Sequence, residues 1–358
     1  MNLFGDAYRG RRVFLTGHTG FKGSWLAAWL SEMGAQVNGF GLSPPTTPNH
    51  WDLLRLGIGD HRGDVCDAAA VRAAVDACRP EIVFHLAAQS LVRRSYRNPL
   101  ESWSANVMGT ANVLDACRSA KTVRAIVVVT TDKVYANCER AWGYKENDPL
   151  GGHDPYSASK AAAELVVESY RKAFFAGNSD ALVATARAGN VIGGGDWSED
   201  RLIPDVVRSI GHNEPVEIRF PNATRSWQHV LECLAGYLIL GEQLLSARRE
   251  CAEAWNFGPN PEDQHTVSAV LRKLQEYWPE IRWQHVPMDQ PHEAGLLHLD
   301  TSKTRSFLGW QPVWSLGCAL SATAQWYRQF AMSGKTLTRE QILSYVEAAK
   351  RSGCSWAA

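Results

Sequence analysis

The sequence has no excess of charge of either sign. Lys plus Arg and Asp plus Glu each total 37 among 358 residues, so the formal net charge is zero. Proteins that bind nucleic acid usually carry a basic excess, and we therefore expect no nucleic-acid partner. An anionic ligand would have to be held by a few well-placed cations and backbone amides.

Long apolar runs are missing as well. No stretch approaches the roughly 18 apolar residues of a membrane span, and residues 1–10 lack the apolar core of a signal peptide. We therefore expect a cytoplasmic protein with no membrane partner. The 8 cysteines lie far apart and form no C-x-x-C pair, which predicts reduced thiols and no metal site.

Internal repeats are absent, and the first half of the chain alternates strand and helix patterns. Short apolar runs predict buried strands at 12–16, 36–40, 81–86, 124–130, 181–186 and 255–257. Helices are predicted at 21–34, 67–78, 101–119, 155–175 and 227–245. Apolar strands separated by helices predict an α/β fold with a doubly wound, Rossmann-type parallel sheet.

The pattern loosens after about Ala186, where Gly, Pro and Asp interrupt it. This change predicts a smaller, mixed α/β C-terminal domain built for a substrate. We expect a dinucleotide-binding domain from residues 1–186 plus about 227–258. Residues 187–226 and 259–358 would then form the substrate domain.

A glycine-rich turn joins the first predicted strand to the first helix. Gly17, Gly20 and Gly23 follow the spacing G-x-x-G-x-x-G. Glycines allow a tight turn and a close approach of the backbone to a pyrophosphate, and the helix N-terminus adds free amides. The cofactor-binding residues predicted here are Gly17, His18, Thr19, Gly20, Phe21 and Lys22.

Further cofactor contacts are predicted at other strand ends. The second strand ends without the usual acid and without an arginine, so this motif does not separate NAD from NADP. Asp64 and Val65 stand where such folds place an acid and an apolar residue against the adenine, and the small side chains of 86–89 suit a cofactor that crosses the sheet. These predicted contacts are Asp64, Val65, Leu86, Ala87, Ala88, Gln89 and Thr130.

A Y-x-x-x-K motif begins the helix predicted at 155–175. Tyr156 and Lys160 share one helix face, and a nearby ammonium would lower the pKa of the Tyr156 phenol. Thr131, Asp132 and Lys133 follow the strand predicted at 124–130, at the sheet edge where such folds bind ligands. We predict all five residues, with Tyr156 and Lys160 also contacting the cofactor, as the catalytic group.

These motifs resemble the nucleotide-sugar 4,6-dehydratases, which are extended short-chain dehydrogenases/reductases. Members of that family carry Thr-Asp-Glu after the fifth strand, whereas this chain has Lys133 in place of Glu. Thr-Asp-Lys resembles the branch that acts on CDP-glucose, as do GHTGFKGSWL, TTDKVY, RAGNVIGGGDW and RSWQHV. The resemblance runs from about Arg11 to Pro312.

The resemblance implies NAD as cofactor and CDP-glucose as substrate. Tyr156 would take the O4 proton during C4 oxidation, Lys133 would remove the C5 proton if it is neutral, and Asp132 would protonate the departing O6. Lys303 lies in a stretch that resembles a sugar-nucleotide contact region. The substrate-binding residues implied are Asn190, Arg201, Leu202, Arg225, Trp227 and His292.

The resemblance also implies a homodimer or homotetramer that pairs through helices 101–119 and 155–175. By analogy, the product would feed 3,6-dideoxyhexose synthesis for lipopolysaccharide O-antigen. Alternatives are a nucleotide-sugar 4-epimerase or decarboxylase, a dehydratase for another nucleotide sugar, and a non-catalytic dinucleotide-sensing module. Epimerases need no Asp132 and Lys133 pair because they lose no water, so the pair favours a dehydratase.

Overall fold

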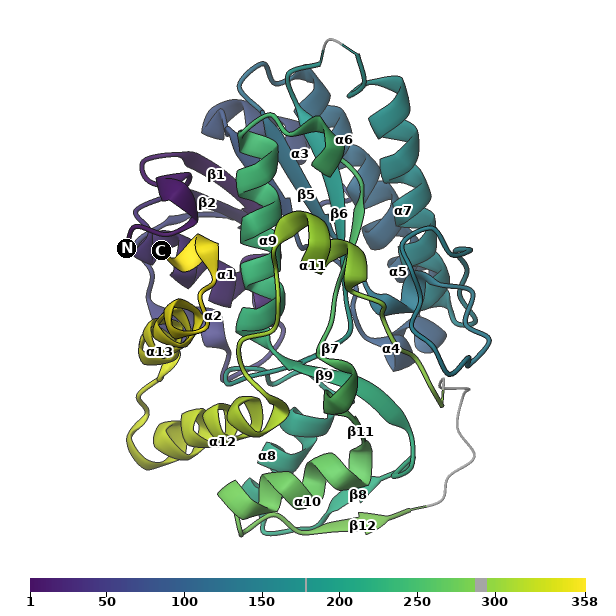
Figure 1. Cartoon of the computed structure of the whole chain (residues 1–358), viewed down its shortest axis with the longest axis vertical. Helices are drawn as coiled ribbons and strands as arrows, with labels where there is room; N and C mark the ends of the chain where they lie inside the picture. The colour runs from purple at the N-terminus through teal and green to yellow at the C-terminus, as the bar shows by residue number, and fades with distance from the viewer. Residues whose placement is uncertain (178, 287–294) are drawn as a thin grey trace.

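The computed structural model describes residues 1–177, 179–286 and 295–358, and within them seven parallel strands form a central sheet (Figure 1). The strand order is β10-β6-β5-β4-β1-β2-β3. This order is that of a doubly wound sheet, as the sequence predicted. The strands are β1 (Arg12–Thr16), β2 (Gln36–Gly41), β3 (Gly59–Arg62), β4 (Ile82–His85), β5 (Ala125–Val129), β6 (Leu182–Ala188) and β10 (Ala254–Phe257).

Both faces of this sheet are buried, which explains the continuous apolar runs. Along β1, Val13 and Leu15 belong to one hydrophobic cluster and Phe14 belongs to the other. Successive side chains of a strand point to opposite faces, so each face needs its own cover of helices.

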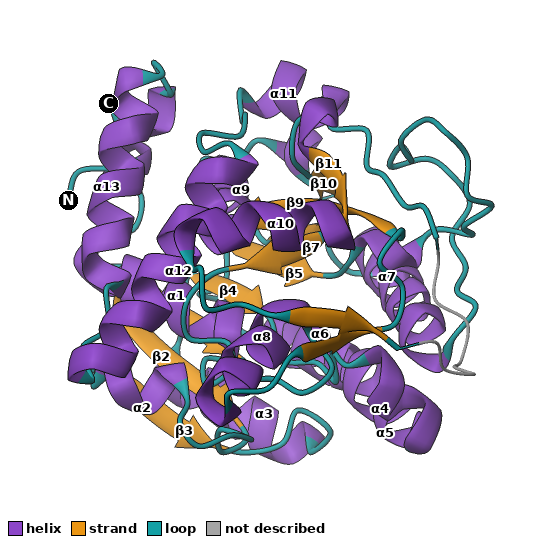
Figure 2. Cartoon of the chain, turned by 90° about the horizontal axis from the view of Figure 1, so that it is seen from below, coloured by secondary structure: helices purple, strands orange, loops and turns teal. Residues whose placement is uncertain are grey.

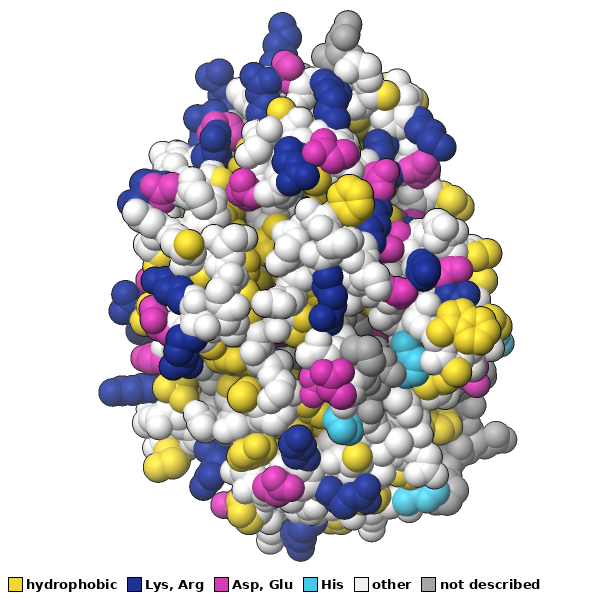
Figure 3. All heavy atoms as spheres, viewed as in Figure 1, with side chains coloured by type: hydrophobic (Ala, Val, Ile, Leu, Met, Phe, Trp, Pro, Cys, Tyr) yellow, Lys and Arg dark blue, Asp and Glu magenta, His cyan; other side chains and the backbone are white. Residues whose placement is uncertain are grey.

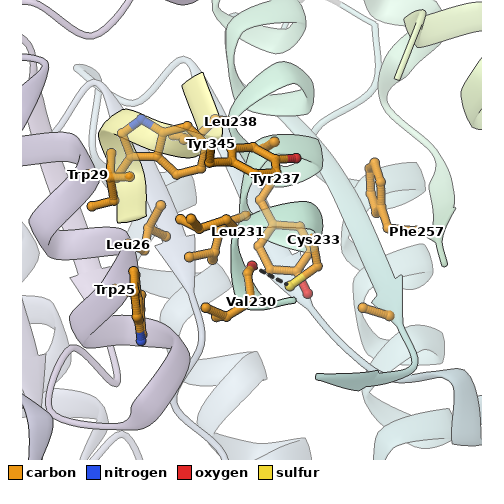
Figure 4. Packing of buried hydrophobic residues seen from close by; sticks show 14 of the residues in the cluster. Trp25, Leu26, Trp29, Val230, Leu231, Cys233, Tyr237, Leu238, Phe257 and Tyr345 are labelled. Carbon is orange, nitrogen blue, oxygen red and sulfur yellow. Dashed lines mark hydrogen bonds between the residues drawn. The ribbon is translucent and has the colours of Figure 1, made fainter. Parts of the chain in front are cut away.

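Helices α3, α6 and α7 cover one face, and α1 and α9 cover the other. Figure 4 shows Leu26 and Trp29 of α1 beside Leu231 of α9. Fully burying a side chain of this size stabilises the fold by about 1.5–3 kcal/mol. The bounds in this part of the chain are α1 (Phe21–Glu32), α2 (His50–Leu54), α3 (Ala68–Cys78), α4 (Val92–Arg97), α5 (Pro99–Trp103), α6 (Gly109–Ser119), α7 (Pro155–Ala173) and α9 (Val230–Leu245).

Most of the remaining elements lie beyond the carboxyl ends of the central strands (Figure 1), except α11 (Ser302–Leu308), which packs against β10, and α13 (Thr338–Arg351), which packs against α1. One small sheet has the order β11-β9-β7, and β12 pairs with β8. The other bounds are β7 (Asn190–Ile192), α8 (Leu202–His212), β8 (Val216–Ile218), β9 (Thr224–His229), β11 (Gln264–Thr266), α10 (Val267–Tyr277), β12 (Trp283–His285) and α12 (Leu316–Ser333).

The end of the chain returns to its beginning. The rings of Phe4 and Trp356 stack with centroids 4.9 Å apart, and α13 packs against α1. Figure 2 shows both termini beside α13, with α4 and α5 on the opposite side. The domain boundaries stated above stay a prediction.

Three features of the described residues concern surface charge, membrane insertion and metal binding. Basic and acidic side chains are interspersed over the face shown in Figure 3, with no large area of one sign. Among the helices in the described part of the chain, none has the length and apolar character needed to cross a membrane. No group of three or more His, Cys, Asp or Glu side chains within the described ranges is arranged to hold a metal ion.

Some sequence-based assignments were wrong. The helix predicted at 227–245 begins at Val230, because Trp227 to His229 pair with β7 as part of β9. Strand β3 has the sequence GDHR and was missed because it lacks an apolar pattern. The helix predicted at 101–119 contains a π-helical turn, Ser104–Met108, between α5 and α6.

Candidate active site

A cavity of about 1010 Å³ lies between the carboxyl ends of the central strands and the smaller sheets. It brings most of the predicted site residues together, although they are spread from residue 17 to residue 227. Its wall includes Gly17, Thr19, Gly20, Phe21, Lys22, Asp64, Val65, Leu86, Ala87, Ala88, Gln89, Thr130, Thr131, Lys133, Tyr156, Lys160, Asn190, Arg201, Leu202, Arg225 and Trp227.

The glycine turn leaves no room for side chains. Gly17 has a φ of +73°, and a Cβ atom there would lie 2.7 Å from the backbone nitrogen of Ala87. A Cβ atom on Gly23 would lie 2.0 Å from the carbonyl oxygen of Gly17. Gly20 precedes α1 without a side-chain cap, so the first amides of α1 are free to donate to an anion. This cradle fits a dinucleotide pyrophosphate.

His18 does not face the cavity, unlike the other side chains of the turn. Its ring is fully buried, and Nε2 lies 2.8 Å from Oδ1 of Asp60 on β3. Burial lowers the pKa of His18, and the hydrogen bond to Asp60 opposes this effect. Any cofactor contact of His18 is therefore restricted to its backbone. Asp60 was not singled out because β3 itself was missed.

Hydrogen bonds within the protein fix the side chains of three other predicted cofactor residues. The Thr19 hydroxyl donates to the Leu42 carbonyl at 2.9 Å, which ties the glycine turn to the end of β2. Asp64 accepts the Cys66 amide at 2.9 Å, and its side chain closes a turn. Lys22 donates to the Tyr237 hydroxyl at 3.3 Å, and burial lowers the pKa of Lys22.

Asn106 is a structural residue of this site that the sequence did not reveal. Its side chain accepts the Gln89 amide at 2.8 Å and donates to the Ser159 hydroxyl at 2.8 Å. The Ser159 hydroxyl in turn donates to the carbonyl of Tyr156 at 2.7 Å. Asn106 thus links the segment after β4 to α7, the helix that carries Tyr156 and Lys160. Its orientation depends on the π-helical turn, for which the sequence holds no signal.

Thr131, Asp132 and Lys133 form a short helical turn directly after β5. Oδ1 of Asp132 accepts the Thr131 hydroxyl at 2.9 Å and the Lys133 ammonium at 3.2 Å. Asp132 is only 2% exposed, whereas a quarter of the Lys133 side chain faces the cavity. Lys133 Nζ also lies 3.5 Å from Oδ1 of Asn190 on β7. The turn therefore holds an acid and a base side by side.

Tyr156 and Lys160 lie in the first turns of α7, and both line the cavity. Burial raises the pKa of Tyr156 to about 12, and the hydrogen bond with Thr131 opposes this effect. The expected lowering of this pKa by Lys160 is not observed, because Lys160 Nζ donates to the Val129 carbonyl at 2.9 Å. Burial lowers the pKa of Lys160 to about 8.

The predicted substrate residues differ in what holds them. Arg201 is paired with Asp196 at 3.1 Å and donates to the Ser90 hydroxyl at 3.0 Å. Arg225 donates to the Thr224 carbonyl at 3.0 Å, and the Trp227 indole is buried. Leu202 begins α8.

One other predicted contact, Lys303, does not line the described cavity. Its ammonium is held by Glu253 at 2.5 Å and lies 4.2 Å from the centre of the Trp255 ring. His292 falls outside the described residues.

A glycine cradle at the first strand, a Tyr and Lys pair on α7 and a polar turn after β5 define the class of extended short-chain dehydrogenases/reductases. Within this class, the chain belongs to the GDP-mannose 4,6 dehydratase family, whose model matches residues 14–322.

Curated relatives include 4,6-dehydratases that act on different nucleotide sugars. The CDP-glucose 4,6-dehydratase of Salmonella typhimurium (strain LT2) is 45% identical over 353 residues, which cover 96% of this chain and 98% of that protein. The dTDP-glucose 4,6-dehydratase of Xanthomonas campestris pv. campestris (strain ATCC 33913) is 28% identical and covers 87% of this chain and 92% of its own.

Solved structures share the fold. The epimerase Mth375 of Methanothermobacter thermautotrophicus superposes with a TM-score of 0.80 at 24% identity, covering 94% of this chain and 96% of that one. The dTDP-glucose 4,6-dehydratase of Bacillus anthracis, solved in complex with NAD, has a TM-score of 0.74 at 19% identity and covers 88% of this chain and 96% of that one.

Proposed function

We propose that this protein is an NAD-dependent dehydratase that converts CDP-D-glucose to CDP-4-dehydro-6-deoxy-D-glucose. The observation that carries the proposal is the ion pair of Lys133 with the buried Asp132, because Lys133 lines the same cavity as Thr131 and Tyr156. An acid and a base side by side suit the removal of water, which an epimerase does not perform. The choice of CDP-glucose rests on the Salmonella relative at 45% identity.

The residues at the cradle fit NAD. Gly17, Gly20 and the first amides of α1 would hold the pyrophosphate, since a Cβ atom on Gly17 or Gly23 would clash with the backbone that shapes the cradle. When bound, NAD would accept the hydride of C4 and later return it to C6. We choose NAD over NADP because the B. anthracis dehydratase was solved with NAD.

Tyr156 acts first in this scheme. As a phenolate it takes the proton of the sugar O4 hydroxyl, and the Thr131 hydroxyl beside it holds the same oxygen in place. The ammonium of Lys160 supplies a positive charge near the N-terminus of α7 while the Tyr156 phenolate is present. A ketone then stands at C4, and it acidifies the hydrogen on C5.

Asp132 and Lys133 carry the right number of protons for the elimination. Transfer of one proton along their 3.2 Å hydrogen bond gives a carboxylic acid and a neutral amine. In that form Lys133 takes the C5 proton while Asp132 gives its proton to O6, which leaves as water. The two residues end as an ion pair once more, and Lys133 later returns its proton to C5.

One proton must still return from Tyr156 to Asp132, and Thr131 lies between these two residues. After one turnover, Tyr156 holds the proton that Asp132 has lost. The Thr131 hydroxyl donates to Asp132 at 2.9 Å and interacts with the Tyr156 phenol, whose pKa it lowers. A proton can therefore pass from Tyr156 through Thr131 to Asp132, which resets all three groups without solvent.

One isotope experiment tests this function. The protein is incubated with NAD and CDP-glucose deuterated at C4, and we expect a 4-keto-6-deoxy product with deuterium at C6. Deuterium returned to C4 in a galacto sugar would identify an epimerase. No turnover with CDP-, dTDP-, UDP- or GDP-sugars would identify a non-catalytic binding module. A higher kcat/KM for dTDP-glucose than for CDP-glucose would overturn the choice of base.

The pairing of helices is proposed as well. Large apolar side chains are exposed on α5, on the π-helical turn and on α7, which contact one another, and Leu100 and Leu165 are 79% and 60% exposed. Such a face suits a homodimer or homotetramer. Leu165→Asp should lower the molecular mass in solution, whereas Met332→Asp, at an exposed position near the end of α12, should leave it unchanged. An unchanged mass for Leu165→Asp would refute this interface.

We also propose that the enzyme works in the cytoplasm and that its product feeds 3,6-dideoxyhexose synthesis for O-antigen. Unpaired cysteines suit a reducing compartment, and the exposed ones include Cys66, Cys138 and Cys318. Deleting the gene in its host should remove any 3,6-dideoxyhexose from the surface polysaccharide, which sugar analysis would show.

A further inference from the structure

Glu164 on α7 and Arg187 on β6 form a buried ion pair behind the catalytic residues. They are 4% and 3% exposed. Oε1 of Glu164 accepts Arg187 Nε at 3.0 Å, and Oε2 accepts Arg187 Nη2 at 2.9 Å, so the guanidinium and the carboxylate meet as two parallel forks. Neither residue lines the cavity, and neither has a part in the scheme above.

The pair contacts both sides of the turn that holds Asp132 and Lys133. Glu164 accepts the hydroxyl of Thr130, directly before this turn, at 2.5 Å. Arg187 donates to the hydroxyl of Tyr135, two residues after Lys133, at 2.9 Å. The turn is therefore fastened at its two ends to one ion pair.

Glu164 itself belongs to α7, the helix that carries Tyr156 and Lys160. Glu164 lies four residues after Lys160, which is one helical turn (Figure 1 shows α7 alongside β6). The Thr185 hydroxyl of β6 also donates to Glu164, at 2.8 Å, but Thr185 touches no catalytic segment through this bond. All four hydrogen bonds given to Glu164 come from Thr130, Thr185 and Arg187.

Stability alone is a weak reason for such a pair. Removing two charges from water costs several kcal/mol for each, and apolar residues of similar volume often serve stability as well. We propose that Glu164 and Arg187 are positioning residues that set the turn 131–133 at its working distance from Tyr156 and Lys160. This inference deepens the proposed function and rests on it for its effect on turnover.

The charge of Glu164 also acts on Lys160. Burial lowers the pKa of Lys160 to about 8, Glu164 raises it, and Lys22 lowers it further. His85 on β4 also senses Lys160, and burial lowers its pKa to about 3, so it is neutral. Removing the charge of Glu164 should thus lower the pKa of Lys160. The loss of activity at alkaline pH should then begin at a lower pH.

Three variants separate position from charge. Thr130→Val removes the bond between Glu164 and the catalytic turn, and Thr185→Val is its matched control because it removes an equivalent bond to β6. Glu164→Gln keeps the shape and removes the charge. We expect kcat to fall about tenfold in Thr130→Val and about 100-fold in Glu164→Gln, with KM nearly unchanged, and to stay near wild type in Thr185→Val. Only Glu164→Gln should move the alkaline limb of the kcat profile to lower pH.

Hydrogen–deuterium exchange of the segment 130–135 tests the positioning without any turnover. Thr130→Val should exchange faster there than Thr185→Val. Equal exchange and equal kcat in these two variants would overturn the proposal, even if Glu164→Gln fails to fold. A folded Glu164→Gln with a wild-type kcat and pH profile would overturn it too. A wild type that turns over no sugar nucleotide while the exchange difference holds would instead refute the proposed function alone.

Discussion

Lys133→Met separates the two halves of the proposed reaction. Methionine keeps the length of the side chain but removes the amine that lies 3.2 Å from Asp132. Tyr156 and the glycine cradle are untouched, so oxidation at C4 should proceed. Loss of water should stop, because a positioned base contributes about 100- to 10,000-fold, which corresponds to about 2.7–5.4 kcal/mol of barrier.

The variant should still fold. Two opposite charges at 3.2 Å attract by about 5 kcal/mol at an effective dielectric constant near 20, before desolvation is subtracted. Desolvation offsets much of this attraction, and a quarter of the Lys133 side chain already meets solvent. Asp132 keeps the hydrogen bond from the Thr131 hydroxyl. We therefore expect the pair to contribute little to the free energy of unfolding.

A single-turnover assay reads the two steps separately. In Lys133→Met the near-ultraviolet absorbance of reduced nicotinamide should rise and persist, because the acceptor at C6 never forms. Exchange of the C5 hydrogen with deuterated water should also be suppressed. Lys145→Met is the matched control, since Lys145 is largely exposed and 3.9 Å from Asp300. If Lys133→Met releases 4-keto-6-deoxy product at a rate near wild type, Lys133 is not the base.

Three further perturbations follow from the structure. Tyr156→Phe should lower kcat about 100- to 10,000-fold, while NAD affinity measured by titration stays within about threefold; a similar loss of affinity and kcat would contradict its role as base. Gly23→Ala should lower the unfolding temperature and abolish NAD binding, because its Cβ atom would lie 2.0 Å from the Gly17 carbonyl oxygen; Gly211→Ala, in open space, is the control. Glu232 accepts the Trp314 amide and the Tyr345 hydroxyl, both at 2.7 Å, and burial raises its pKa to about 7. A raised carboxyl pKa stabilises the fold at low pH, and about 3 kcal/mol of this contribution is lost as pH rises from about 4.5 to about 7. Denaturant unfolding of Glu232→Gln should lack this slope, and an identical pH dependence would show that Glu232 titrates normally.

The sequence by itself determined the class of fold and predicted most of the residues that the structure places around one cavity. Apolar runs such as 125–129 could only be strands buried on both faces, and the structure places β5 there. The glycines of the turn lie close together along the chain, and so do Tyr156 and Lys160, so their shared place at the cavity wall follows from local geometry. Local spacing is enough when the partners are one turn or one helix apart.

Tertiary structure decided everything that joins distant segments. Residues 227–229 look helical in sequence, but pairing with β7 draws them into a strand. His18 turns toward Asp60, Asn106 bridges Gln89 and Ser159, and Glu164 meets Arg187 only because β6 lies under α7. Such contacts depend on which strands are neighbours and which way a buried side chain turns. Packing settles both, and the order of residues along the chain does not record them.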